Sequence, residues 1–255
     1  MNKKIKSDYK EINNVAQKNE LIRNSTGEIN LVPLKILKFL ISCIDTENPP
    51  DDYTVIATKR ELLAFSGASG KGELSYLKLQ LRSLITAIPI IDEDDKVKMV
   101  SLITDFSWVP ESDYVRVAFH KDIWPYVTDL KKNFLQYNIN QIKNFKSKFS
   151  LVLYEYLLSY TRQYGTKTVK IDIQTLRRVT GTSKKYKDFK DFELAVIKKA
   201  QKEINEDQYL EYIFTYEKVY EGRTVDSINF FLRKRTSLFD SLEHTEYPER
   251  LSQAI

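Results

Sequence analysis

The residues best suited to a specific chemistry in this sequence are the lysines and arginines between positions 177 and 202. Nine basic side chains stand there against three carboxylates, so the stretch carries a net charge of +6, whereas the whole chain of 255 residues carries +5. Positive charge concentrated in one segment is typical of a surface that binds a polyanion such as nucleic acid. A solvated helix face with incidental charge is the alternative interpretation.

Groups for catalysis or metal binding are scarce by comparison. The sequence has two histidines and one cysteine, too few for a His/Cys metal cluster. The segment 67–72 (GASGKG) lacks P-loop spacing, because its glycines stand too close together and Gly72 follows Lys71 where a P-loop has Ser or Thr. We therefore expect no catalytic residue, no metal site, no cofactor and no enzyme activity. An enzyme or phosphate-binding protein that uses this segment is the competing class.

The elements that must position the basic residues recur in both halves of the chain. Apolar periodicity in the second half predicts helices and strands in the order of a winged helix. They are a helix from about Ser147, a strand at 167–172, helices at 173–181 and 188–205, and a hairpin that turns at 221–223. The first half shows helices at 31–44, 59–67 and 74–86, a strand at 53–58, and β runs at 97–109 and 113–120. The sequence thus predicts an α+β fold of two tandem winged-helix domains.

The order of elements also sets the expected domain limits. We predict an N-terminal winged-helix domain at 1–133 for dimerisation and DNA contact, the main DNA-binding domain at 134–235, and an acidic tail at 236–255. No apolar run reaches the roughly 18 residues of a membrane span, and the first 20 residues lack the apolar core of a signal peptide. With a single cysteine, the composition indicates a cytoplasmic protein in a reducing compartment.

The helix at 188–205 is predicted to read DNA. At about 100° per residue one side of the helix gathers apolar residues, which leaves the opposite face for a major groove. The residues predicted to face the core are Phe189, Phe192, Val196, Ala200 and Ile204. Lys146 and Lys148 stand at the start of the Ser147 helix, where free N–H groups and the helix dipole favour a phosphate. The DNA-binding residues predicted for this half are Lys146, Lys148, Arg177, Arg178, Lys184, Lys185, Lys187, Lys190, Leu194, Lys198 and the wing residue Arg223.

The equivalent helix of the first half, 74–86, has a less basic exposed face. Its predicted DNA contacts are Ser75, Lys78 and Arg82, with a surface helix of incidental charge as the alternative.

Four segments, in this order and spacing, resemble the iteron-binding plasmid replication initiators of the theta type. They are 144–160 (NFKSKFSLVLYEYLLSY), 176–181 (LRRVTG), 186–205 (YKDFKDFELAVIKKAQKEIN) and 216–230 (YEKVYEGRTVDSINF). The resemblance implies tandem winged helices that bind direct repeats in double-stranded origin DNA and help to open the adjacent A·T-rich DNA. It also implies recruitment of the host initiator and replicative helicase as partners, and no membrane partner. A dimeric winged-helix repressor without initiator activity stays open as the alternative.

The resemblance further implies exchange between a monomer and a dimer, with the dimer surface in the first domain. Leu34, Leu37, Ile41 and Ile44 look similar to a zipper-like segment there, and a buried core stripe is the alternative. One departure from the family concerns the reading helix. Arg or Lys usually follow the Phe that matches Phe192, whereas this chain has Glu193, Leu194 and Ala195. Base reading then relies on the surrounding lysines, or on Leu194 and Ala195 against thymine methyls.

Overall fold

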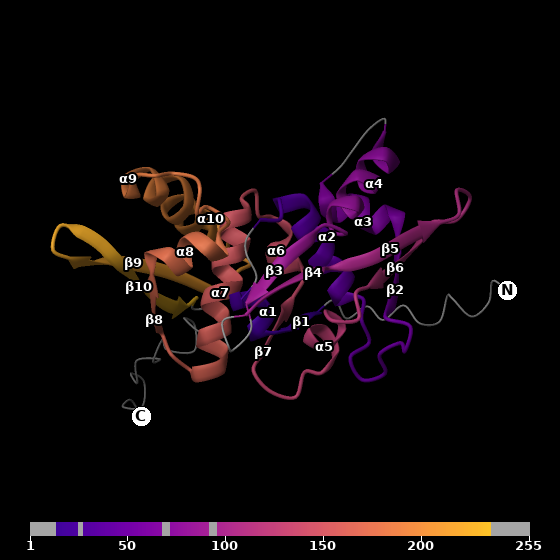
Figure 1. Ribbon diagram of the computed structural model, residues 1–255, viewed down its shortest axis with the longest axis horizontal. Helices are drawn as coiled ribbons and strands as arrows, with labels where there is room; N and C mark the ends of the chain where they lie inside the picture. Colours follow the sequence, from indigo (N-terminus) through magenta and orange to yellow (C-terminus); the bar gives the residue numbers. More distant parts are fainter. Residues whose placement is uncertain (1–13, 25–27, 68–71, 92–95, 236–255) are drawn as a thin grey trace, which may run out of the picture.

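The computed structural model describes residues 14–24, 28–67, 72–91 and 96–235. The predicted tail at 236–255 and positions 68–71 of the glycine-rich segment lie outside the described residues. Figure 1 shows an elongated molecule in which the two halves of the chain lie side by side, joined through α7 and its neighbours. Every helix in the described part of the chain is too short or too polar to cross a membrane.

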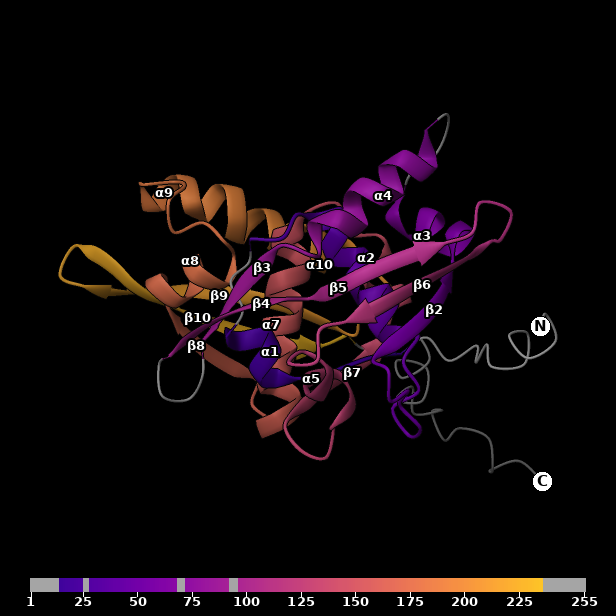
Figure 2. The same cartoon turned by 45° about the vertical axis from the view of Figure 1, so that its right-hand side comes forward.

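The N-terminal half is built around an antiparallel sheet of strand order β2-β6-β5, against which α2 and α3 pack, while α4 packs on α2 and α3 (Figure 2). Thr58 begins α3, because its hydroxyl accepts a hydrogen bond from Glu61 N at 3.2 Å, and Gly67 ends it at a φ of +76°. The elements are β1 (Asn14–Lys18), α1 (Asn19–Asn24), α2 (Leu31–Ser42), β2 (Thr54–Thr58), α3 (Lys59–Ser66), α4 (Glu73–Ser83), β3 (Ala87–Ile91), β4 (Val97–Ser101), β5 (Ile103–Trp108), β6 (Tyr114–Phe119) and α5 (Trp124–Thr128).

The C-terminal half repeats the plan with an antiparallel sheet of order β8-β10-β9. Asp172 begins α8 by accepting a hydrogen bond from Thr175 N at 2.8 Å, as the sequence predicted. The elements are β7 (Phe134–Asn138), α6 (Asn140–Lys143), α7 (Lys148–Tyr164), β8 (Thr168–Asp172), α8 (Ile173–Val179), α9 (Phe189–Phe192), a π-helical turn η1 (Glu193–Lys198), α10 (Lys199–Glu206), β9 (Tyr212–Glu221) and β10 (Thr224–Lys234).

A two-stranded sheet, β3-β4, was missing from the sequence-based expectation. The β run at 97–109 is two strands: β4 pairs with β3, while β5 pairs with β6. The break falls at Leu102, which is buried and donates its N–H to Leu84 O at 3.2 Å. Pro89 does not end a helix, because α4 ends at Ser83 and Pro89 lies within β3.

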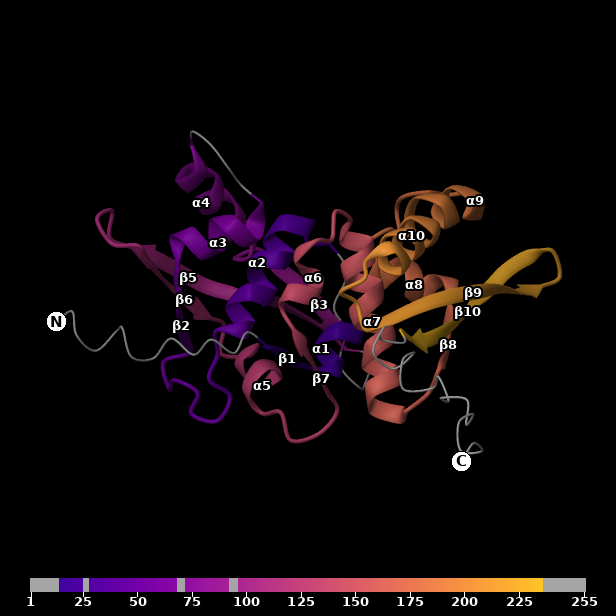
Figure 3. The ribbon, with the colours of Figure 1, turned by 180° about the vertical axis from the view of Figure 1, so that it is seen from behind.

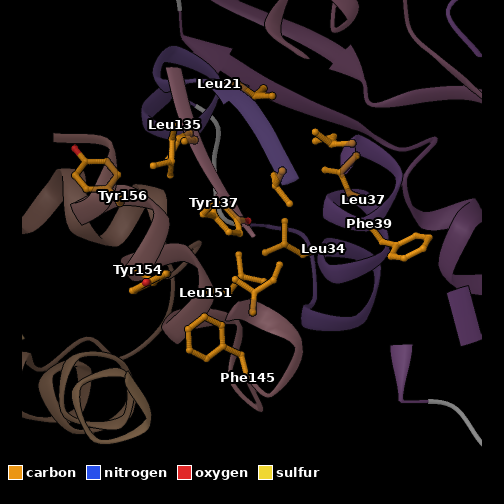
Figure 4. Packing of buried hydrophobic residues seen from close by; sticks show 14 of the residues in the cluster. Leu21, Leu34, Leu37, Phe39, Leu135, Tyr137, Phe145, Leu151, Tyr154 and Tyr156 are labelled. Carbon is orange, nitrogen blue, oxygen red and sulfur yellow. The ribbon is translucent and has the colours of Figure 1, made fainter. Parts of the chain in front are cut away.

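The two halves share one hydrophobic core. Strand β7 lies beyond the predicted boundary at 133/134, yet it pairs antiparallel with β1, from Lys18 opposite Phe134 to Asn14 opposite Asn138. Figure 4 shows Leu34 of α2 pointing toward Leu151 of α7, with Tyr137 of β7 beside them. Residues 134–138 are therefore hydrogen-bonded to the N-terminal half, and α7 packs against both halves.

The apolar stripe of α2 is part of this core. Leu34, Leu37, Ile41 and Ile44 are all buried, with at most 9% of any residue exposed. The zipper-like dimer surface that the resemblance implied is therefore not on the surface in this conformation, and the buried core stripe describes these residues. A 3, 4, 3 spacing of apolar residues fits either arrangement, because both need one apolar helix face.

A buried polar cluster joins the halves inside the core. Lys38 of α2 lies 2.9 Å from Glu155 of α7, and less than a tenth of either side chain is exposed. Gln17 donates to Glu155 at 2.8 Å and accepts from Lys38 at 2.8 Å, while the Tyr137 hydroxyl donates to Glu155 at 2.6 Å. Buried charges are tolerated only when paired and hydrogen-bonded, and this carboxylate meets both conditions.

A second set of contacts joins α1 to the C-terminal half. The Arg23 guanidinium lies 3.6 Å from the centre of the Tyr160 ring and donates to Ser159 Oγ at 2.9 Å. Asn19 donates to Ser159 O at 3.2 Å, and Arg178 of α8 donates to Arg23 O at 3.1 Å. The halves are thus held by directional polar bonds as well as by apolar packing.

We expect loss of one partner of the Lys38–Glu155 pair to destabilise the protein by about 3–5 kcal/mol, because the other charge stays buried without its counter-charge. The variants Lys38→Met and Glu155→Leu should each show this loss in urea unfolding, and the double variant should cost less than their sum. The exposed pair Lys202–Glu206 is the control, since its loss should cost under about 1 kcal/mol. Additive losses would contradict the pairing.

Candidate nucleic-acid interface

The C-terminal reading helix is one continuous element made of α9, η1 and α10, residues 189–206. Phe192, Val196, Ala200 and Ile204 are buried on its inner side as predicted, whereas Phe189 is half-buried. Glu193 and Ile197 are buried too, although the helical wheel did not place them inside. The π-helical turn at Glu193–Lys198 accounts for this difference, because its wider turn brings an extra residue to the inner side.

The outer side of this helix faces solvent. Leu194 is 65% exposed, and Lys198, Lys199 and Lys202 are exposed beside it. Lys199 was absent from the predicted site, although its neighbour Lys198 was in it. An apolar side chain bordered by lysines suits a groove whose walls are phosphates and whose floor carries thymine methyls.

The turn before the reading helix adds further positive charge to the same end of the molecule. Lys184, Lys185 and Lys187 of this turn are exposed, as is Lys190 at the start of the helix. Neither these four nor Lys198 forms an ion pair with another described residue. Their charges are therefore available to an external anion.

The β9–β10 hairpin is the wing of the C-terminal half. Its turn passes through Gly222 at a φ of +60°, and Arg223 next to it is exposed. Figure 1 shows the hairpin tip and α9 at the same end of the molecule. Arg223 therefore has the exposed position that its predicted contact with a phosphate or minor groove requires.

The two arginines of α8 that were predicted to contact DNA donate hydrogen bonds to backbone carbonyls of the protein. Arg177 donates to Lys185 O at 2.9 Å and to Lys187 O at 3.3 Å, and its guanidinium lies 4.6 Å from the centre of the Phe192 ring. Arg178 donates to the carbonyl of Arg23, as described above. Both arginines are half-buried and brace the protein itself, and a phosphate contact by either stays a prediction.

The start of α7 also differs from the expected phosphate site. Glu203 of α10 accepts hydrogen bonds there from Lys146 N and from Ser150 Oγ. Lys146 is exposed, but Lys148 is half-buried, and burial together with the nearby charge of Lys185 lowers the pKa of Lys148. The protein's own carboxylate thus stands at the positive end of the helix, where free N–H groups for a phosphate were expected.

The N-terminal half presents α4 as the equivalent helix. Ser75, Lys78 and Arg82 are exposed, as their prediction requires, and Leu79 between them is 62% exposed. Figures 1 and 3 show α4 and α9 at the same upper side of the molecule, one in each half. One DNA segment along that side would meet both helices.

A carboxylate in the C-terminal reading helix has a role that the sequence analysis missed. Glu193 turns inward, where it accepts hydrogen bonds from the Tyr216 hydroxyl at 2.7 Å and from Lys218 Nζ at 3.1 Å. Burial alone would raise the pKa of Glu193, but these two hydrogen bonds, together with the positive charges of Lys218 and Lys198, hold the pKa below its ordinary value. The sequence carried a signal for this role, because an acidic residue is unexpected in a helix that faces phosphates.

Two helix–turn–helix units, each with a β hairpin, define a tandem winged-helix protein with a basic face. Within the described residues, no three His, Cys, Asp or Glu side chains come together as they would around a metal ion. This fold and this charged face belong to the class of proteins that bind nucleic acid.

Comparison with known sequences narrows the class to one family. Residues 14–158 match the family described as "Initiator Replication protein, WH1", and residues 172–232 match "Initiator Rep protein, WH2". The chain therefore belongs to the family of initiator replication proteins, which confirms the predicted fold class and the resemblance to plasmid initiators. A replication initiation protein of Escherichia coli is 25% identical over 223 residues, which cover 82% of this chain and 68% of the relative.

Solved structures agree on the fold. The Pi initiator protein, solved in complex with iteron DNA, superimposes with a TM-score of 0.70 at 17% identity, over 89% of this chain and 100% of that one. Domains 2 and 3 of RctB superimpose with a TM-score of 0.52 at 10% identity, over 81% of each chain.

Arg177→Ala should lower the free energy of unfolding by about 1–3 kcal/mol, because two backbone carbonyls lose their donor and the Phe192 ring loses its stacked cation. Arg177→Lys should not restore the loss, since an ammonium cannot reproduce the planar fork. Lys184→Ala is the matched control, an exposed cation of the same turn whose loss should change stability by less than about 0.5 kcal/mol. Urea unfolding measures all three, and equal stability of Arg177→Ala and Lys184→Ala would contradict the bracing role.

Proposed function

We propose that this protein initiates plasmid replication by binding repeated sequences, iterons, in double-stranded origin DNA through both winged helices. The observation that carries the proposal is the position of two exposed reading helices, α4 and α9–α10, on one side of a single rigid core. Membership of the initiator family supports it, as does the similarity in fold to an initiator solved with iteron DNA.

The two reading helices contribute unequally to DNA binding in this proposal. The C-terminal helix and the turn at 184–187 before it carry more exposed lysines than α4 carries cations, so they supply most of the phosphate contacts. The hydroxyl of Ser75 and the side chains of Lys78 and Arg82 bring α4 to a neighbouring stretch of the same duplex. The lysines fix the register, and discrimination between sequences rests on side chains that reach base edges, Leu194 and Lys198 among them.

The steps that follow binding belong to the same proposal. The bound initiator helps to open the adjacent A·T-rich DNA, recruits the host initiator and the replicative helicase, and exchanges between a monomer and a dimer. The resemblance to iteron-binding initiators supports these steps. The protein acts by binding and is not an enzyme.

Selection of bound fragments from random duplex DNA tests the proposal. At about 150 mM salt, where non-specific phosphate binding is weak, we expect enrichment of one motif that a monomer binds as tandem direct copies. Enrichment of an inverted repeat bound only by dimers would replace the initiator with a winged-helix repressor. Absence of any enriched motif would reduce the basic face to a general polyanion surface and refute the proposal.

Two lysine variants should separate phosphate contact from base reading. Lys185→Ala should weaken binding to every duplex and lower the slope of log affinity against log salt by about one. Lys198→Ala should instead cost about 1–3 kcal/mol on the selected motif and relax its discrimination from random DNA. Lys131, 89% exposed in the loop after α5, provides the control, because Lys131→Ala removes the same charge away from the interface. Equal losses for Lys198→Ala on selected and random duplexes would contradict base reading.

A further inference from the structure

Glu193 lies in the reading helix, where a negative charge that faced DNA would oppose binding. It follows Phe192 directly and begins the π-helical turn. Only 7% of the residue is exposed, so its carboxylate does not face the groove side on which Leu194 lies. The charge is instead neutralised inside the domain, by Lys218 of the wing strand β9.

Both oxygens of this carboxylate are committed to the wing. Tyr216 donates to Oε1 and Lys218 donates to Oε2, and both residues belong to β9. The Tyr216 ring packs against Phe230 of β10 at 6.3 Å between ring centres, so the hydroxyl has a fixed position. Lys218 also lies 5.7 Å from the centre of the Phe189 ring in the first turn of the helix. Glu193 thus connects the reading helix to β9 directly, and to β10 through the Tyr216 ring.

The connection matters because the helix and the wing must meet the duplex together. A winged helix places its helix in a groove while the hairpin reaches the neighbouring backbone or minor groove, so their relative position sets the register of every contact. Contacts that are held in place by a second layer of hydrogen bonds lose less entropy on binding than contacts on a loose element.

We propose that Glu193 is a positioning residue that locks the reading helix to the wing, and that it sets sequence discrimination without touching DNA. The inference rests on the proposed function. A structural reason then exists for the departure from the family pattern at position 193. The Arg or Lys usual at this position would have no hydrogen-bond partner between Tyr216 and Lys218.

The sign of the effect separates this role from simple charge. If Glu193 acted only through its negative charge, its removal would tighten binding to all DNA equally. If Glu193 locks the helix to the wing, its removal tightens binding to random DNA, because Lys218 becomes free, but it lowers the ratio of selected to random affinity. Asp191, an exposed carboxylate two positions earlier on the same helix, is the matched control.

The experiment compares Glu193→Ala, Tyr216→Phe and Asp191→Ala in the full chain, on the selected duplex and on a random duplex of equal length. We expect the ratio of selected to random affinity to fall by about tenfold in Glu193→Ala and Tyr216→Phe, because a factor of ten corresponds to about one hydrogen bond to a charged group. The ratio should stay unchanged in Asp191→Ala. Tyr216→Phe alters no charge and removes one hydroxyl, so it remains informative if Glu193→Ala fails to fold. An unchanged ratio in Tyr216→Phe, or in a folded Glu193→Ala, would overturn the proposal.

Amide hydrogen exchange in the DNA-free protein keeps this test independent of the proposed function. Exchange within 193–198 and 214–219 should accelerate several-fold in Glu193→Ala and Tyr216→Phe, and not in Asp191→Ala. If no motif is selected but exchange accelerates, the proposed function fails while the lock stands. Unchanged exchange in both variants would remove the lock itself.

Discussion

The arrangement of the molecule depends on the buried ion pair between Lys38 and Glu155. Both side chains are almost fully enclosed, and Gln17 and Tyr137 satisfy the remaining capacity of the carboxylate. An apolar interface tolerates sliding, whereas a buried carboxylate with three donors has one favourable position. The pair sits where α2 meets α7, so it fixes the N-terminal half to the helix on which the C-terminal half is built. The placement of α4 and α9 at the same side of the molecule depends on that attachment (Figure 1).

Among the basic residues of the C-terminal half, one group stabilises the protein itself and another faces solvent. Arg177, Arg178 and Arg235 donate to backbone carbonyls, and Arg235 alone reaches four of them at and just after the end of α10. The lysines of the turn, together with Lys198 and Lys199 of the outer helix face, project into solvent without a carboxylate partner among the described residues, whereas Lys202 pairs with Glu206. A rigid guanidinium suits several fixed carbonyls, while an ammonium on a flexible stem suits phosphates whose positions vary.

Periodicity in the sequence predicted the two winged helices, because helix faces and alternating strands leave a local signal. It also predicted most of the buried residues of the reading helix. The differences are Phe189, which is half-buried, and Glu193 and Ile197, which the π-helical turn brings inside. The roles of Arg177 and Glu203 were beyond prediction, since their acceptors and donors lie on other elements. The stripe from Leu34 to Ile44 shows the same limit. Its spacing defines an apolar face, and only the tertiary structure shows what covers that face.

The net charge of residues 177–202 is therefore a poor measure of what a duplex would meet. Two of its nine cations are engaged inside the protein, and one of its three carboxylates is neutralised by Lys218. What remains outside is a set of lysines around Leu194, and a similar setting surrounds Leu79 on α4. Lysine contacts with phosphates weaken as salt rises, whereas burial of a leucine against a thymine methyl does not depend on counter-ions. In the proposed complex, salt therefore tunes affinity far more than discrimination, and the two exposed leucines are where an apolar contribution to discrimination resides.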